Sequence, residues 1–148
     1  MGVDIFGLNP KSEKGEYFRS NWWHWRPIWL FTIILCPDLL DREYEMVIQH
    51  EDGSEEKIVY KGYEAGMTND GLQIPADVAE EIGRRILEVL KEPEDEIKRI
   101  AEGIKGSKYD VIAEKVMSML DRNYYHLDRE FLKKWAEFCL ECGGFEVC

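Results

Sequence analysis

Residues 21–36 read NWWHWRPIWLFTIILC, and this stretch holds four of the five tryptophans in the chain. Proline is favoured as the first residue of a helix, where its missing N–H costs nothing, so Pro27 indicates a helix that begins there. Trp22 and Trp23 then lie in the turn that leads into the helix. Proline cannot continue a helix, so we expect this one to stop or kink at Pro37.

Two of these tryptophans have the spacing of core residues. Trp25 and Trp29 are one turn apart on the expected helix and share a side with Ile33. Aromatic side chains at helical spacing usually belong to a core. We therefore predict that both rings are buried.

Polar and aromatic residues around the same stretch have the composition of a binding site. A planar guanidinium beside indole faces suits anions and flat rings. We therefore predict a pocket for an anionic small molecule or a nucleotide, with a purely structural aromatic cluster as the alternative. The candidate lining residues are Tyr17, Arg19, Trp22, Trp23, His24 and Arg26, with Asn69 and Asp70 of the TNDG sequence as further contributors.

Length and composition indicate one domain that spans residues 1–148. A chain of this size buries roughly 68–70% of its unfolded surface, and 45% of its residues are hydrophobic against 33% charged. The net charge of −11 disfavours a broad nucleic-acid surface. The longest apolar run, residues 28–36, is too short to span a bilayer, and the N-terminus lacks a signal-peptide pattern. We expect a cytoplasmic protein with no membrane partner.

A short strand and a polar segment precede the tryptophan-rich stretch. Residues 3–8 (VDIFGL) are β-prone and end at Asn9 and Pro10, which is typical of a strand followed by a turn. Residues 11–20 (KSEKGEYFRS) are polar, so we expect them to form a surface loop.

A β-hairpin is predicted in the middle of the chain. Residues 43–63 (EYEMVIQHEDGSEEKIVYKGY) alternate on both sides of Asp52 and Gly53, a dipeptide that favours a hairpin tip. We expect the register that gathers the apolar side chains on one face. That register pairs Ile48 with Ile58 and Met46 with Tyr60.

Helices are expected after Pro75, where the apolar period changes from two to about 3.6 residues. The first runs from Pro75 to the residue before Pro93. A shorter helix over residues 93–106 and another over residues 107–120 follow it. The stripe of the first helix consists of Val78, Ile82, Ile86, Val89 and Leu90.

The C-terminal part predicts one more helix and a short strand. Asp128 is the expected N-cap of the helix, and Gly143 is its expected stop. Its apolar face carries Phe131, Trp135, Phe138 and Cys142. Residues 145–148 (FEVC) can add one strand. The chain therefore predicts an α+β fold: a small, mainly antiparallel sheet of N-terminal strand, central hairpin and short C-terminal strand, covered by about four or five helices.

Three separated segments carry a recognisable pattern. They are MGVDIFGLNPKSEKGEYFRSNWWHWRPIW at residues 1–29, TNDG at 68–71 and FCLECGGFEVC at 138–148. With its G-x-D-I-x-G strand, G-E-Y-F-R, W-R-P-x-W and final G-G-F, the chain resembles a family of small uncharacterised proteins of phages, prophages and scattered microbial genomes. The resemblance implies an accessory protein of a phage or mobile element, without implying an activity. The charged hairpin and the Glu/Lys-rich residues 93–105 depart from the pattern.

The four cysteines allow three interpretations. Cys139 and Cys142 form a C-x-x-C, Cys148 lies six residues later and Cys36 lies far upstream. They can be buried free thiols on an apolar stripe, a disulfide, or a zinc site. Because there is no second C-x-x-C, we favour buried thiols and predict neither a metal nor another cofactor.

Catalytic motifs are absent from the sequence, which holds no G-x-S-x-G, H-E-x-x-H, P-loop or dinucleotide glycine fingerprint. The first functional hypothesis is an accessory protein that binds an anionic small molecule or nucleotide through the Arg/Trp-rich segment. The second is an interaction factor whose acidic surface binds a basic host protein. The third is a small enzyme that uses Glu16, His24 and Arg26.

Overall fold

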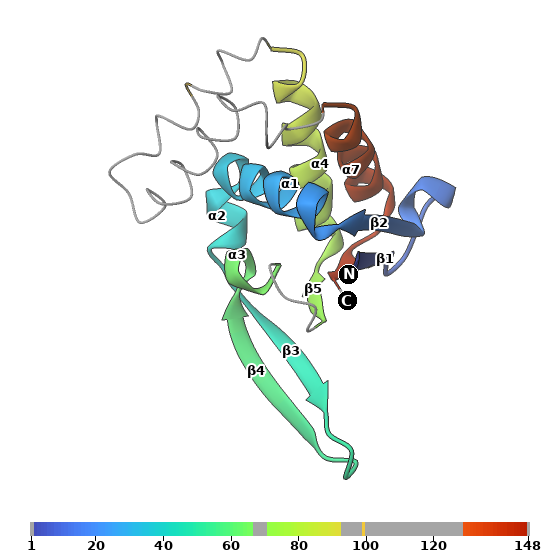
Figure 1. Ribbon diagram of the computed structural model, residues 1–148, viewed down its shortest axis with the longest axis vertical. Helices are drawn as coiled ribbons and strands as arrows, with labels where there is room; N and C mark the ends of the chain where they lie inside the picture. The colour runs from blue at the N-terminus through green and yellow to red at the C-terminus, as the bar shows by residue number, and fades with distance from the viewer. Residues whose placement is uncertain (1, 67–70, 93–98, 100–128, 148) are drawn as a thin grey trace.

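The computed structural model describes residues 2–66, 71–92, 99 and 129–147, and these residues form an α+β fold (Figure 1). Four strands make one antiparallel sheet, and two more make a separate hairpin. The described elements are β1 (Gly2–Gly7), the short 3-10 helix η1 (Glu13–Gly15), β2 (Tyr17–Asn21), α1 (Trp22–Leu35), α2 (Pro37–Leu40), β3 (Glu43–Gln49), β4 (Glu55–Lys61), α3 (Gly62–Ala65), β5 (Leu72–Ile74), α4 (Ala76–Val89), α7 (Arg129–Glu141) and β6 (Phe145–Val147).

The four-stranded sheet has the order β2-β1-β6-β5, so the first and last strands of the chain lie side by side at its centre. Ile5 is opposite Phe18 of β2 and also opposite Val147 of β6. Side chains alternate between the two faces of a sheet. The face toward the helices is buried and consists of Val3, Ile5, Phe18, Ser20, Leu72, Ile74, Phe145 and Val147. The N-terminal and C-terminal strands are confirmed.

The loop expected over residues 11–20 is wrong in its second half. Residues 17–21 form β2, which pairs with β1 along its whole length. Phe18 and Ser20 are buried, whereas the other three positions of the strand are exposed. Most of its side chains face water, so the composition of the segment is polar. Its buried and exposed side chains nevertheless alternate, as in an edge strand.

Helix α1 begins at Trp22 and not at Pro27, so the two tryptophans expected before the helix form its first turn. Asn21 is the N-cap, and its Oδ1 accepts a hydrogen bond from the backbone N–H of His24 at 2.9 Å. Pro27 lies inside the helix, where it removes one backbone hydrogen bond. The cap and the burial of the apolar run after it outweigh that loss. As expected, α1 ends before Pro37.

Helices α1, α4 and α7 pack over the inner face of the four-stranded sheet and share one core with it (Figure 1). Trp25 and Trp29 are fully buried there, as predicted. Their rings stack with centroids 5.4 Å apart, and Trp135 of α7 meets Trp25 edge-on at 5.0 Å. Trp25 Nε1 donates to the Gly66 carbonyl at 2.9 Å, and Trp29 Nε1 donates to the Tyr63 carbonyl at 3.1 Å. These bonds satisfy the polar edges of two buried rings.

The expected helices α4 and α7 are confirmed where the structure describes them. Helix α4 follows Pro75 and buries its predicted apolar stripe against the core. Gly143 follows α7 with φ of 64°, a left-handed conformation that glycine adopts without strain. The helices predicted over residues 93–106 and 107–120, and the cap at Asp128, lie outside the described residues.

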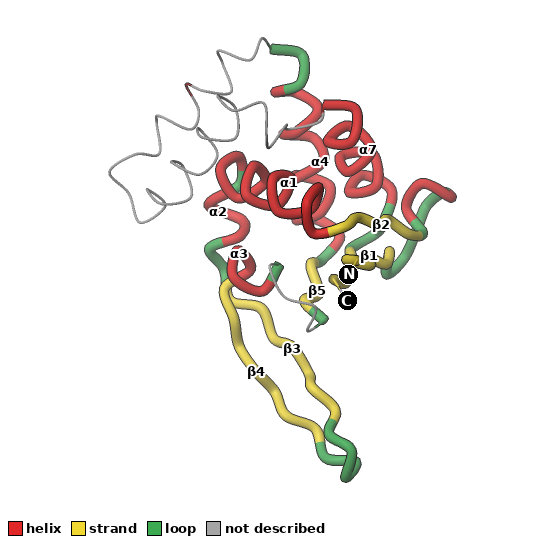
Figure 2. The backbone as a smooth tube through the Cα atoms, in the orientation of Figure 1, coloured by secondary structure: helices red, strands yellow, loops and turns green. Residues whose placement is uncertain are grey.

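The hairpin β3–β4 does not join the four-stranded sheet, contrary to the expected architecture. Figure 2 shows it as a two-stranded arm that extends away from the body. The expected register is also wrong. Met46 lies opposite Ile58, and Ile48 lies opposite Glu56, so the strands are shifted by two residues from the predicted pairing.

The turn of the hairpin explains this shift. Glu51, Asp52 and Gly53 form a three-residue loop, closed by a hydrogen bond from the His50 N–H to the Ser54 carbonyl at 2.9 Å. Gly53 has φ of 86°, as the last residue of such a loop requires. A shift of two residues leaves every side chain on its expected face, so alternation alone could not separate the two registers.

Candidate functional site

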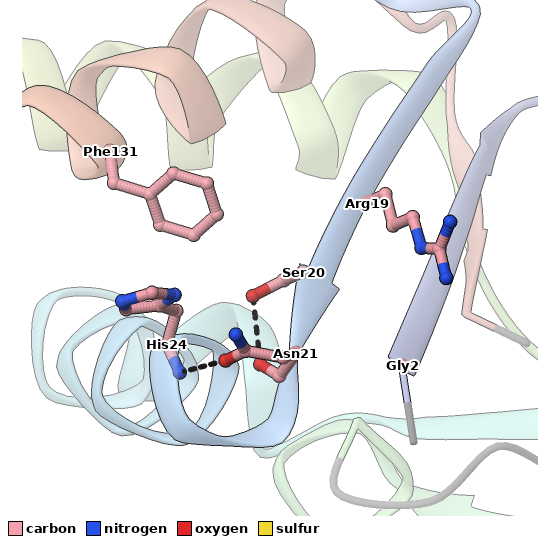
Figure 3. Close-up of a pocket in the computed structure, with 6 residues that line it drawn as sticks. All are labelled: Gly2, Arg19, Ser20, Asn21, His24 and Phe131. Atoms are coloured by element: carbon pink, nitrogen blue, oxygen red, sulfur yellow. Dashed lines mark hydrogen bonds between the residues drawn. The ribbon is translucent and has the colours of Figure 1, made fainter.

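A hollow of about 480 Å³ opens where β2 passes into α1 (Figure 3). The strand and the helix follow each other without a loop, so residues on both sides of the junction are close in space. The first residue of β1 and the start of α7 complete the wall. The lining residues are Gly2, Arg19, Ser20, Asn21, His24 and Phe131.

The junction itself supplies the polar groups of the hollow. The Ser20 hydroxyl donates to the carbonyl of Asn21 at 2.9 Å. Asn21 Oδ1 caps the N–H of His24, and the first turn of α1 contains no acidic residue. The N–H groups of a first turn have no partner within the helix, and the helix dipole makes this end positive. The hollow therefore borders the positive end of the α1 dipole.

His24 and Phe131 bring α1 and α7 together at the hollow. Their ring centroids are 5.4 Å apart, with an angle of 54° between the planes. Phe131 also packs on Phe18, whose centroid is 5.2 Å away. His24 is an exposed residue. Figure 3 shows its imidazole beside the ring of Phe131. It can therefore meet a ligand without losing this contact.

Arg19 lies on the opposite face of β2 from Ser20. In Figure 3 its side chain points away from His24 and across β1. Its Nε is 4.0 Å from Asp4 Oδ1, and its side chain is 72% exposed. Asp4 also accepts a hydrogen bond from the Tyr17 hydroxyl, and this bond raises the pKa of Tyr17. Arg19 is thus a residue at the edge of the hollow, and its guanidinium, loosely paired with Asp4, lies over β1.

The structure brings together only part of the predicted ligand-binding set. Arg19 and His24 border the hollow, and Tyr17 lies on the outer face of the sheet, two residues before Arg19. Arg26 is exposed on α1 but does not line the hollow. Residues two apart on a helix differ by roughly 200° in direction, so His24 and Arg26 do not face the same side.

The remaining predicted residues lie partly outside the described structure. The backbone of Trp22 and Trp23 forms the first turn of α1, next to the hollow, while their side chains are outside the described part. Asn69 and Asp70 also fall outside it.

Sequence reasoning missed four lining residues: Gly2, Ser20, Asn21 and Phe131. The role of Asn21 could have been predicted from the sequence, because asparagine is a preferred N-cap and this one precedes an aromatic, apolar run. Phe131 carried no such signal, since its approach to His24 depends on the packing of α7 against α1 and β2. It was predicted as one of the core residues, and it does pack against the core from the rim.

The cysteines that the structure describes are buried free thiols. Burial raises the pKa of Cys36 to about 12 and that of Cys142 to about 11, and it also raises the pKa of Cys139. In the described part of the chain, no group of three or more His, Cys, Asp or Glu side chains is placed to hold a metal ion. Cys148, the fourth candidate ligand, lies outside that part.

The residues of the enzyme hypothesis are separated. Glu16 precedes β2 and His24 follows it, so the length of a five-residue strand, roughly 17 Å, lies between them. General acid–base chemistry needs groups within hydrogen-bond reach of one substrate. Strand β2 therefore separates Glu16 from His24, and Arg26 points to another side of α1 than His24. The enzyme hypothesis stays a prediction.

Comparison with protein-family models, with curated proteins and with solved structures finds no match. The resemblance to phage and prophage proteins therefore stays a prediction. No helix among residues 2–66, 71–92 and 129–147 is long and apolar enough to cross a membrane.

Proposed function

We propose that this protein is a non-catalytic binding protein that holds an anionic small molecule, most favourably a nucleotide, at the hollow between β2, α1 and α7. One observation carries the proposal: Asn21 and His24 border a hollow at the positive end of a 14-residue helix, and the Arg19 guanidinium lies at its edge, over β1. Guanidinium, imidazole and first-turn N–H groups are all donors to phosphate or carboxylate oxygens.

The outer face of the sheet favours a nucleotide over a simple anion. Phe6 and Tyr17 lie opposite each other on β1 and β2, with ring centroids 5.2 Å apart. They are 44% and 45% exposed, so both rings are accessible to a ligand. Tyr17 is two residues from Arg19, or about 7 Å along the strand. A phosphate near Arg19 thus leaves a flat base within reach of exposed aromatic rings.

The charge of the chain favours a small ligand. At a net charge of −11, the protein repels an extended polyanion such as DNA or RNA. The binding of a single phosphate group depends mainly on the charges close to it. Salt screens the repulsion from more distant acidic residues, with a screening length of about 10 Å at 0.1 M salt. The family resemblance supports the setting: an accessory protein of a phage or mobile element that acts in the cytoplasm.

Isothermal titration calorimetry with a purine nucleoside triphosphate, inorganic pyrophosphate and an uncharged purine nucleoside tests the proposal. We expect the triphosphate to bind most tightly. Arg19→Ala and His24→Ala should each weaken binding about tenfold or more, because hydrogen bonds to charged groups contribute about 1.5–3 kcal/mol. Arg84→Ala is the matched control, since Arg84 is an exposed arginine on α4 that pairs with Glu81 and Glu88. Equal affinity of the wild-type protein and the three variants for the triphosphate would exclude the hollow as the site.

A further inference from the structure

The β3–β4 arm is the part of the structure that the proposed function does not use. Its two strands have seven residues each, so the arm is roughly 24 Å long. Within the described residues, β3 and β4 pair only with each other, and Figure 1 shows the arm leaving the body beside α3 and β5. A two-stranded hairpin is only marginally stable by itself in water.

The base of the arm is fixed to the body. The Tyr44 hydroxyl donates to the carbonyl of Leu39 at 2.8 Å, and Lys61 Nζ donates to the carbonyl of Asp41 at 3.1 Å. The ring of Tyr44 covers Gly62, where an added Cβ would lie 2.9 Å from Tyr44 Cε2. These contacts anchor the arm to the body at its base.

Two valines form an apolar patch on one face of the arm. Val47 lies opposite Lys57, and Val59 lies opposite Glu45, so the valines are diagonal neighbours across the strands. Val47 is 49% exposed and Val59 is 52% exposed. The two side chains leave apolar area on a projecting element, where a protein partner can bury it.

The charge of the arm as a whole indicates the kind of partner. Directly beside the valines, Lys57 and Glu45 balance each other, and Glu56 lies on the other face of the arm, 3.0 Å from His50. From Glu45 to Lys57 the arm carries five acidic residues and one lysine, a net charge of −4 with histidine neutral; the acids are Glu45, Glu51, Asp52, Glu55 and Glu56. Two arms of this kind would repel each other, which disfavours a second copy of the chain as the occupant. A partner with basic residues around an apolar groove would be attracted to the acidic arm electrostatically and would bury the two valines on binding.

We propose that the β3–β4 arm is a docking element for a protein partner with a basic surface, which buries Val47 and Val59 and pairs its Lys or Arg side chains with the acidic residues at the far end of the arm. The arm and the hollow use different residues on different elements, so this interaction is independent of the proposed anion site.

A peptide of ten residues that alternates lysine and valine serves as the probe of basic, apolar strand-like surfaces, and its glutamate–valine counterpart is the charge control. We expect the basic peptide to bind the full-length protein and to shift the amide NMR signals of residues 45–59, with an affinity that falls as salt rises. The acidic peptide should not bind. Binding without these shifts, or equal binding of both peptides, would overturn the proposal.

Variants of the arm separate its apolar and charged contributions. The double variant Val47→Thr/Val59→Thr keeps β-branched side chains in the strands. It should lower the affinity for the basic peptide about tenfold, because apolar contact is lost. Glu55→Gln with Glu56→Gln should weaken binding and flatten its salt dependence. Unchanged affinity in both double variants would exclude the arm as the docking surface. Sedimentation of the protein alone should show no association through the arm, and a dimer that Val47→Thr/Val59→Thr abolishes would make a second copy the partner instead.

Discussion

The indole ring of Trp29 lies directly against Gly66, so closely that a methyl group at Gly66 would overlap atoms Cε2 and Cζ2 of the ring. Gly66 also accepts the N–H of Trp25 through its carbonyl. The end of α3 thus contacts both of the stacked tryptophans of α1. This contact connects the tryptophan-rich helix to the segment that follows the hairpin arm.

Gly66→Ala should destabilise the protein by about 1–3 kcal/mol or more, as overpacking of a filled core does. The cause is steric, because Gly66 has φ of −67° and ψ of −13°, which alanine adopts freely. Urea unfolding measures the change. In a Trp29→Leu background the same substitution should cost clearly less. If the two destabilisations are additive in the double variant, the Trp29 ring is not the cause of the steric overlap at residue 66.

Trp25→Ala and Trp29→Ala should each cost about 3–5 kcal/mol, since both rings are fully buried. Arg19→Ala and His24→Ala should each cost less than about 1 kcal/mol, because both residues are exposed and Arg19 is only loosely paired with Asp4. Thermal and urea unfolding of the four variants gives the comparison. If the Arg19 variant unfolds as readily as the tryptophan variants do, the arginine is a structural residue and the ligand hypothesis loses its main support.

Cysteine pairs can report the hairpin register directly. Val47 and Lys57 are directly opposite in the structure, whereas the register expected from apolar matching places Val47 opposite Val59. Opposed residues on paired strands lie within the range of Cα separations that a disulfide spans. Val47→Cys/Lys57→Cys should therefore oxidise readily, and Val47→Cys/Val59→Cys should do so poorly. Mass spectrometry of the oxidised variants decides between them, and the reverse order would restore the first register.

The buried thiols should be inert in the native protein. Burial raises the pKa of Cys36 to about 12 and of Cys142 to about 11, so at pH 8 both are protonated, and the thiolate is the reactive form. In a Cys148→Ser variant, a thiol-specific chromophoric reagent should label the native protein slowly and the urea-unfolded protein with three equivalents. Rapid labelling of the folded variant would show that these side chains are accessible.

Sequence patterns predicted the parts of the fold that depend on local periodicity. Trp25 and Trp29 were placed in the core because their spacing holds wherever the helix starts, and the start itself was missed because the Asn21 cap outweighs the preference of Pro27 for a first turn. The hairpin tip was predicted from its glycine. Its register was not, because a shift of two residues preserves the alternation.

The candidate site was predicted only where its residues are neighbours in sequence. Arg19 and His24 stand within one short segment, and both border the hollow. Phe131 reaches the same hollow from more than a hundred positions away, through the packing of α7. Arg26 belongs to the segment but points to another side of α1, a separation that follows from a helix start before His24.

The binding of a phosphate-bearing ligand at the hollow is tested most directly by titration of ¹⁵N-labelled protein with a purine nucleoside triphosphate, followed by amide chemical shifts. We predict saturable shifts at Gly2, at residues 19–24 and at Phe131, with smaller shifts at Phe6 and Tyr17, and their loss in Arg19→Ala. Saturable shifts confined to other elements, or no shifts at millimolar ligand, would contradict the proposed function.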